Sequence, residues 1–452
     1  MALTRTILYH RSGSRQRQKY CHCPHDGSRA GARNDIEIVD SIRGKKIIRT
    51  TSKYKPLFLS IFLFILIASP LSAKKDPDQR TIILTVHSIA LEGNLLGESP
   101  NRKVMVHLPL GYNESEERRY PVLYLLHGFN ADYYLWTVGR FWLGKGWNIT
   151  NVADSLIEAG EIKPMIIVMP SAHNKYGGSW YVNSGIMGDW DDFITIELVH
   201  EIDATFKTID NSSSRGIAGH SMGGFGAVWL GMEHPDIFGS VYGMSTSRLD
   251  FEINMLKELE NNMLEASLIS DADLFKTLSF STQLAISLGA AFSPNPLNLP
   301  FFVNLPIVYE DGNKIFLDDV WQKWMKFSVA TDEYLTGYEQ RRGGQILSFD
   351  IGSADKWLIS NMSFSAELSK RNIDHNFQEY DGDHLNKISS RLTNIVLPFF
   401  SESFRHQVSE SDGIFGSKYS LSYLGAAVLL IFLLIRRIFR KLKIPEINKY
   451  SE

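Results

Sequence analysis

The stretch that decides the fold is RGIAGHSMGGFGAVWL, residues 215–230. A short apolar run ending at Ala218 leads into Gly-His-Ser-Met-Gly, and a run of small, helix-compatible residues follows. This order of strand, turn and helix is typical of the nucleophile elbow, G-x-S-x-G, in which the serine lies on a sharp turn. The turn strains the backbone of Ser221, and Gly219 and Gly223 flank it because side chains there would collide with the adjoining strand and helix. A plain tight turn is the alternative, but the flanking residues favour the elbow.

The composition limits the classes of protein to be considered. The chain has 452 residues, is 44% hydrophobic and carries a formal charge of −3, which suits one large α/β domain with appendages. A charge this close to neutral gives no reason to expect a nucleic-acid partner. Cys21 and Cys23 lie too close together for an easy disulfide, and with His22 and His25 they do not complete a zinc site of the usual spacing. We therefore expect no metal and no cofactor.

The N-terminal part has the pattern of a secretory signal. Residues 1–55 form a basic leader that we expect to be unstructured, and 56–73 combine a short apolar core with a helix breaker and small residues before a charge. This pattern predicts a signal peptide cleaved near Ala73. An uncleaved signal anchor is the alternative. The long leader is either a start assigned too far upstream or a cytoplasmic tail, and the sequence leaves both open.

The C-terminal part has the pattern of a membrane anchor. A polar linker at 401–418 precedes an almost wholly apolar stretch at 419–437, and basic residues continue into the tail at 438–452. The stretch is short for a span, but flanking arginines can extend their side chains to the interface. Basic residues on one side predict a cytoplasmic tail. Together with the signal, this predicts an extracytoplasmic domain anchored by a C-terminal transmembrane helix.

Between these segments, residues 80–400 alternate strand-like and helix-like patterns. The continuous apolar run at 121–126 suits a strand buried on both faces, as in a mostly parallel sheet. The pattern predicts a doubly wound α/β sheet with a strand that includes the short apolar run at 217–218 before the elbow. The other predicted strands are at 82–86, 103–109, 121–126, 165–170, 241–244, 345–351 and 376–380, and the predicted helices are at 189–206, 363–371 and 385–399.

The alternation of strand-like and helix-like patterns stops at 245–344. This region instead contains helix-like stretches at 251–268, 272–278, 282–291 and 317–327. We expect an insertion that covers the C-terminal edge of the sheet and shapes the acyl or alcohol pocket. A helical layer that only packs on the surface is the alternative, and it is compatible with the first.

A serine nucleophile needs a base, which in the α/β-hydrolase order follows both the serine and an acid. His384 lies in a loop after the strand at 376–380, at the C-terminal edge of the sheet, and is the predicted base. His234 lies in a His-Pro turn directly after the elbow helix, His375 precedes a strand at the opposite edge, and His406 lies in the linker.

The acid should also follow a strand. Asp355 lies in the loop after the strand at 345–351, whereas Asp350 falls inside that strand and would point into a face of the sheet. Asp381 and Asp383 are close to His384 in sequence, and such near neighbours rarely reach its Nδ1. We therefore predict Asp355 as the acid.

The tetrahedral intermediate needs two backbone N–H donors. Met222, directly after the nucleophile, is expected to supply one. The second should come from the loop after the strand at 121–126, hence from Phe129. His127 could be mistaken for a base, but its position at a strand end before glycine favours a structural hydrogen bond.

The residues that carry a family likeness are YLLHGF (124–129), 164–170, GHSMGG (219–224) and GDH (382–384). They resemble the "Putative esterase" family, which includes S-formylglutathione hydrolase (esterase D), feruloyl and acetyl xylan esterases, enterochelin esterase-like proteins and the antigen 85 mycolyltransferases. The likeness covers about residues 82–400. It implies an α/β-hydrolase fold and metal-free hydrolysis of carboxylic esters by the triad Ser221, Asp355 and His384. Substrate choice varies across the family.

The sequence thus predicts a membrane-anchored serine esterase that acts through an acyl-enzyme on a small-molecule, glycan or lipid ester outside the cytoplasm. Two alternatives remain open. The acyl group could pass to an alcohol, as the likeness to antigen 85 allows, or the fold could serve as a non-catalytic surface-binding protein.

Overall fold

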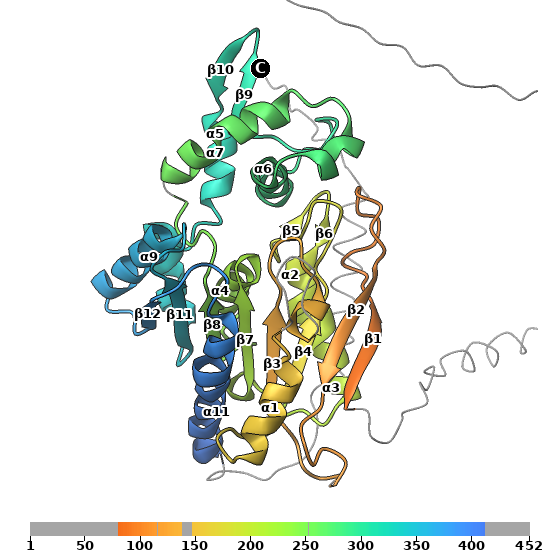
Figure 1. Cartoon of the computed structure of the whole chain (residues 1–452), viewed down its shortest axis with the longest axis vertical. Coiled ribbons are helices and arrows are strands. Elements are labelled where there is room, and N and C mark those ends of the chain that lie inside the picture. The colour runs from red at the N-terminus through yellow and green to blue at the C-terminus, as the bar shows by residue number, and fades with distance from the viewer. Residues whose placement is uncertain (1–79, 115, 138–146, 252, 412–452) are drawn as a thin grey trace, which may run out of the picture. The chain divides into compact units, whose positions relative to one another are not determined.

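The computed structural model describes residues 80–114, 116–137, 147–251 and 253–411. Within them, eight strands form the central sheet in the order β1-β2-β4-β3-β7-β8-β11-β12 (Figure 1). The pairs β1–β2 and β2–β4 are antiparallel and every other neighbouring pair is parallel, so the predicted mostly parallel sheet is confirmed. The strands are β1 (Thr81–His87), β2 (Asn101–His107), β3 (Val122–Leu126), β4 (Ile166–Pro170), β7 (Arg215–His220), β8 (Ser240–Met244), β11 (Ile346–Gly352) and β12 (Asn376–Tyr380).

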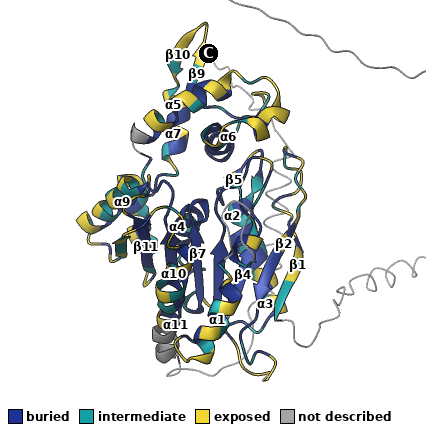
Figure 2. Cartoon of the chain, viewed as in Figure 1, coloured by how far each residue is buried: buried dark blue, intermediate teal, exposed yellow. Residues whose placement is uncertain are grey.

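Helices cover both faces of the sheet. One apolar cluster joins α3 (Val199–Thr205), α4 (Met222–Glu233) and α9 (Leu358–Lys370) to one face. A second cluster joins the other face to α1 (Ile149–Glu158) and to the C-terminal helices α10 (Ile388–Arg391) and α11 (Leu397–Ser411). In the central strand β3, Tyr124 belongs to the first cluster and Leu123 and Leu125 to the second. Alternate side chains of a strand point to opposite faces, which is why the whole run is apolar and buried (Figure 2).

Residues 245–344 form a largely helical insertion, which lies above one end of the sheet in Figure 1. The ends of helices α5, α6 and α7 lie within two residues of their predicted ranges, and a 3₁₀ helix occupies another predicted range. The sequence did not predict α8 or the hairpin β9–β10. The elements are α5 (Ile253–Ser267), a 3₁₀ helix (Ala272–Thr277), α6 (Phe280–Phe292), β9 (Ile307–Glu310), β10 (Asn313–Phe316), α7 (Asp318–Met325) and α8 (Asp332–Arg341).

Two helical segments differ in detail from the prediction. The helix expected at 189–206 is formed by α2 (Trp190–Asp192), a π-helical stretch (Phe193–Leu198) and α3. The last helix was expected to end at Phe399, but α10, a second π-helical stretch (Leu392–Val396) and α11 continue to Ser411. The linker predicted from 401 is therefore wrong in its first part. The reason is packing, because Phe400 and Phe404 are fully buried against strand β7 at Gly216, where a Cβ would collide with Phe400.

Two shorter strands, β5 (Asn183–Ser184) and β6 (Gly188–Asp189), form a small hairpin, and 3₁₀ helices occur at Tyr133–Trp136 and Ser212–Ser214. In the part of the chain that the structure describes, no helix combines the length and the apolar character needed to cross a bilayer. The predicted leader (1–55), signal segment (56–73), anchor (419–437) and tail (438–452) lie outside the described residues.

Candidate active site

The turn between β7 and α4 has the predicted strained geometry. Ser221 has φ 62° and ψ −118°, in a region that non-glycine residues rarely adopt. A Cβ at Gly219 would collide with the backbone of Gly223, and a Cβ at Gly223 would collide with the carbonyl of Leu126. The two glycines therefore let strand, turn and helix approach one another closely, and Ser221 immediately precedes the helix.

Three side chains form a continuous line of hydrogen bonds at this turn. The Nε2 atom of His384 lies 2.9 Å from Oγ of Ser221. The Nδ1 atom of the same ring lies 2.7 Å from Oδ2 of Asp355. A hydroxyl, an imidazole and a buried carboxylate in this order are able to act as a nucleophile, a base and an orienting acid.

The sheet brings these residues together. Strands β7, β8, β11 and β12 are parallel neighbours in that order, so their carboxyl ends share one edge. Ser221 follows β7, Asp355 follows β11 and His384 follows β12. The Asp355 side chain is completely buried, and its other oxygen, Oδ1, accepts the N–H of Trp357 at 3.1 Å. This second bond orients the carboxylate toward the histidine.

The other histidines considered from the sequence lie elsewhere. His234 ends α4 and lies 2.7 Å from Asp191, while His375 contacts Ser365 and its own loop. His127 is fully buried, and its Nε2 accepts the N–H of Ala172 at 2.8 Å. This is the structural hydrogen bond expected of His127. The side chain of His406 lies outside the described part of the chain.

The alternative acids Asp350 and Asp383 are also placed apart from His384 Nδ1. Asp350 points into the sheet, as expected, where its Oδ2 lies 2.7 Å from Nη2 of Arg391 and accepts the hydroxyl of Tyr242 at 2.8 Å. Asp383 is exposed and accepts the N–H groups of Leu385 and Asn386. These hydrogen bonds lower the pKa of Asp383.

The two predicted N–H donors belong to residues beside the serine. Met222 is the first residue of α4, so its N–H has no acceptor within the helix. Phe129 follows Gly128, and a Cβ at Gly128 would lie 3.3 Å from Cβ of Ser221. The peptide before Phe129 thus lies close to the nucleophile. Both residues line the same pocket as Ser221.

That pocket has a volume of about 740 Å³ and is walled mainly by aromatic and aliphatic side chains. The insertion contributes Phe280 and Leu284 from α6, which supports its predicted role in shaping the pocket. The other large apolar lining residues are Phe129, Leu135, Trp147, Trp180, Met222, Trp357 and Leu385. An apolar cleft with a few polar groups at one point suits a small-molecule ligand.

The sequence analysis missed two residues that support the histidine. His220, the second residue of the G-x-S-x-G motif, has its Nε2 2.9 Å from the carbonyl oxygen of His384, and the two rings lie 4.8 Å apart. Burial lowers the pKa of His220 to about 3, so the ring is neutral and donates this bond. The rings of Trp357 and His384 pack in a T-shaped arrangement, with their centres 4.7 Å apart. The only feature of the sequence that could have pointed to Trp357 is its position two residues after the predicted acid.

A family model described as "Putative esterase" matches residues 98–388, which is more than half of the chain. The chain belongs to this family. The match spans the described residues that carry the strained serine, its hydrogen-bonded partners and the insertion. The predicted family likeness is therefore confirmed.

Curated relatives match this family member over part of its length. An endo-1,4-beta-xylanase/feruloyl esterase of Xylanibacter ruminicola is 34% identical over 143 residues, which is 30% of this chain and 18% of the relative. An esterase of Mycobacterium tuberculosis is 35% identical over 158 residues, which is 33% of this chain and 31% of the relative. The chain thus matches less than a third of the length of these relatives. A solved ferulic acid esterase structure aligns with a TM-score of 0.47 and 24% identity, over 72% of this chain and 98% of that one.

Proposed function

We propose that this member of the esterase family is a serine carboxylic-ester hydrolase in which Ser221, His384 and Asp355 are the catalytic residues. The observation that carries the proposal is the line of hydrogen bonds from the strained serine through His384 to a buried carboxylate, at the floor of an apolar pocket. Family membership supports the same class of reaction.

In the proposed reaction, His384 Nε2 takes the hydroxyl proton as Oγ of Ser221 attacks the ester carbonyl carbon. Asp355 holds the imidazole in the tautomer with the proton on Nδ1 and stabilises the imidazolium that forms. The N–H groups of Met222 and Phe129 would donate to the oxyanion, and each such donor is worth about 3 kcal/mol of barrier.

Collapse of the tetrahedral intermediate releases the alcohol, which takes the proton from His384 and leaves an acyl group on Ser221. Water then enters, and His384 removes one of its protons as the oxygen attacks the acyl carbon. The second tetrahedral intermediate collapses to the free acid as His384 returns the proton to Oγ of Ser221. The neutral His220, which donates to the His384 carbonyl, keeps the loop of the base in place without adding a competing charge.

For the domain organisation, we propose that residues 80–411 are the catalytic unit, and that 56–73 and 419–437 direct and anchor it outside the cytoplasm, as the sequence patterns predict. The aromatic pocket and the name of the feruloyl esterase relative both favour esters with an aromatic acyl group as the first substrates to test.

The test is the full-length Ser221→Ala variant with p-nitrophenyl acetate and methyl ferulate. We expect kcat to fall by about 10⁶-fold, because the nucleophile is lost, and labelling by a fluorophosphonate probe to disappear. Thermal unfolding should stay near wild type. If the variant keeps its activity, or if the wild type never labels, the proposal is wrong. Product analysis with glycerol present separates hydrolysis from acyl transfer.

A further inference from the structure

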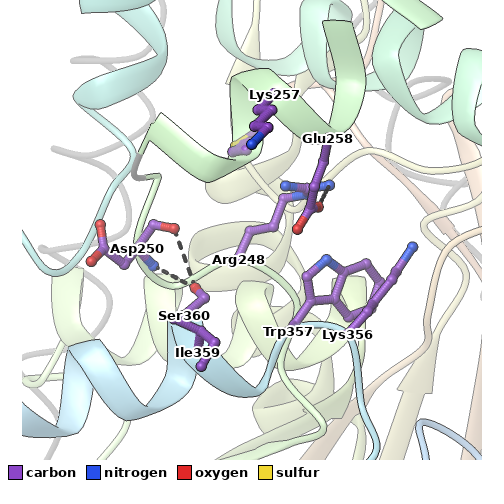
Figure 3. A pocket seen from close by; sticks show the side chains of 9 residues that line it. Arg248, Asp250, Lys257, Glu258, Lys356, Trp357, Ile359 and Ser360 are labelled. Carbon is purple, nitrogen blue, oxygen red and sulfur yellow. Dashed lines mark hydrogen bonds and ion pairs between the residues drawn. The ribbon is translucent and has the colours of Figure 1, made fainter. Parts of the chain in front are cut away.

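A second cavity adjoins the catalytic pocket. It has a volume of about 390 Å³ and lies between the loop after β8, helix α5 and the start of α9 (Figure 3). Trp357 and Lys356 line both cavities, so they form the wall between them. The rings of Trp357 and His384 pack in a T-shaped arrangement with their centres 4.7 Å apart, while the guanidinium carbon of Arg248 lies 5.9 Å from the centre of the Trp357 ring. A ligand that passes Trp357 therefore moves from the base toward Arg248.

Arg248 is tied closely to the nucleophile through the chain. The N–H of Ser247 donates to the carbonyl of Ser221 at 3.2 Å, and Arg248 is the next residue. Arg248 has a φ of 53°, which places a long side chain in a backbone region that favours glycine. Such strain persists where the surroundings hold the residue in one place, and it is concentrated at ligand sites.

The Arg248 side chain is only 4% exposed, yet it has few partners. Its Nη2 lies 3.2 Å from Oε2 of Glu258, whose own side chain is 45% exposed. Arg391 has more hydrogen-bond acceptors than Arg248, because its Nε and Nη2 donate to Asp350, Tyr242 and Gln378. Buried charges are normally paired and fully hydrogen-bonded, because an unpaired charge away from water is costly.

Two buried donors at this cavity lack acceptors. Among the described residues, neither Nε of Arg248 nor Nε1 of Trp357 has a hydrogen-bond partner. Glu258 pairs with Nη2 of Arg248, but each of these two N–H groups is left without a hydrogen bond, which costs free energy in the folded chain.

The remaining charges around the cavity are mostly positive. The ammonium of Lys356 lies 4.4 Å from the centre of the Trp357 ring, and Lys257 is exposed at the rim. Asp250 also lines the cavity, but its carboxylate accepts the hydroxyl of Ser363 and points away from Arg248 in Figure 3. Glu258 is then the carboxylate that faces the guanidinium. Burial lowers the pKa of Arg248 to about 10, and burial followed by the charge of Arg248 lowers the pKa of Lys356.

We propose that this cavity is a cationic subsite, made by Arg248, Lys356 and Trp357, that binds a carboxylate on the substrate while the ester of the same molecule lies at Ser221. The inference rests on the proposed function for the ester, and it narrows the substrate class to acidic esters. The carboxylate would lie against the two cations and compete with Glu258 for Arg248. The alternative is that the Arg248–Glu258 ion pair only holds α5 against the loop after β8, and the experiment must distinguish the two.

The test compares esters that differ in charge at the same reacting centre. On the acyl side, the mono-p-nitrophenyl ester of adipic acid is paired with its methyl ester. On the alcohol side, 4-acetoxybenzoate is paired with methyl 4-acetoxybenzoate. The readout is the ratio of kcat/KM for the acidic ester to kcat/KM for its neutral partner, so general damage to catalysis cancels. We expect a ratio above one in at least one pair, and a fall in that ratio as salt is added.

The variants should move this ratio in opposite directions. Arg248→Gln should lower it roughly tenfold, because a hydrogen bond to a charged group is lost. Lys356→Gln, at an exposed residue that can change without unfolding the chain, should lower it roughly threefold. Glu258→Gln should raise it, since the competing carboxylate is gone. Lys370→Gln, which removes one positive charge at the far end of α9, is the matched control and should leave the ratio unchanged.

A purely structural ion pair predicts that Glu258→Gln and Arg248→Gln both destabilise the fold without changing the ratio, and that result overturns the proposal. Calorimetric titration of the Ser221→Ala protein with 4-acetoxybenzoate and its methyl ester keeps the subsite testable if no ester is hydrolysed. Tighter binding of the anion that weakens roughly threefold in the Ser221→Ala/Lys356→Gln double variant supports the subsite. Equal binding of the anion and the methyl ester overturns it, whatever happens to the proposed hydrolysis.

Discussion

Two carboxylates of one strand and its loop have opposite surroundings. The side chains of Asp350 and Asp355 are both completely buried. Asp350 lies inside β11 and is enclosed by Arg391, Tyr242 and the backbone of Ser245. Asp355 lies just past the end of the same strand and holds a histidine whose other nitrogen contacts Ser221 at the open pocket.

The difference shows what the end of a strand provides. Inside the sheet, a carboxylate has fixed neighbours on the adjoining strands. It can form an ion pair and hydrogen bonds with them, but it cannot reach the pocket. Beyond the carboxyl end, the loop is free to direct the same group toward residues of other loops, which is where open α/β sheets bind ligands. We refer to the Asp350–Arg391–Tyr242 group as the buried cluster and to the Ser221–His384–Asp355 group as the edge cluster.

The largest expected effect is on the edge cluster. Asp355→Asn should lower kcat for p-nitrophenyl acetate by about 10⁴-fold, because an amide does not stabilise the imidazolium and favours the wrong tautomer of His384. The thermal midpoint should change little. Steady-state kinetics and thermal unfolding of the same preparation measure both. Activity within tenfold of the wild type would exclude Asp355 as the acid.

Asp350→Asn should lower the stability of the fold and leave kcat nearly unchanged, the reverse of what is expected for Asp355→Asn. The change leaves the half-buried Arg391 without its carboxylate, and loss of one partner of such a pair costs up to about 3 kcal/mol of unfolding free energy. Urea denaturation measures this, and kcat of the folded fraction should stay within about tenfold, since the buried cluster does not touch the reacting atoms. The Asp350→Asn/Arg391→Gln double variant should recover part of the loss, because both partners are gone. Strictly additive losses would contradict the pairing.

A third expected effect concerns His220, which links the elbow to the edge cluster. Burial lowers the pKa of His220 from 6.5 to about 3, so between these values the unfolded chain binds a proton that the folded chain does not. Stability from this group is fully present above pH 6.5 and is lost as the pH falls toward 3, by up to about 1.4 kcal/mol per pH unit.

The check is His220→Gln, in which this contribution is absent. The free energy of unfolding of the variant should depend less steeply on pH between 4 and 6.5 than that of the wild type. Urea denaturation at several pH values gives the two slopes. Equal slopes would mean that His220 is protonated in the folded protein.

The smallest expected effect is at Asp383, the exposed carboxylate next to the base. Asp383→Asn should change kcat/KM by no more than about threefold, because an amide oxygen can still accept the two N–H groups of the loop. The same ester assay measures it, with Asp355→Asn as the reference. If Asp383→Asn lost as much activity as Asp355→Asn, then Asp383 would have to be considered as the acid in place of Asp355.

Local chemistry explains which parts of the fold were predictable. The run from Val122 to Leu126 is apolar on both faces, so its burial within a parallel sheet follows from the sequence alone. The hairpin β9–β10 was missed because its strands are short and mostly exposed, with little alternation to detect, although its turn carries Asp311 and Gly312. The continuation of the last helix to Ser411 was missed because it depends on burial of Phe404, which only the folded sheet provides.

The sequence by itself determined the elbow and the identity of the edge cluster. Glycines around a strained serine are a local requirement, and loops that follow parallel strands end at one edge of the sheet. Only the tertiary structure decided the contacts. Ser221 and His384 are 163 residues apart in the chain and 2.9 Å apart in space. The cationic subsite likewise depends on packing of the loop after β8 against α5 and α9, because charges far apart in sequence can share one cavity only after the sheet has set the order of its strands.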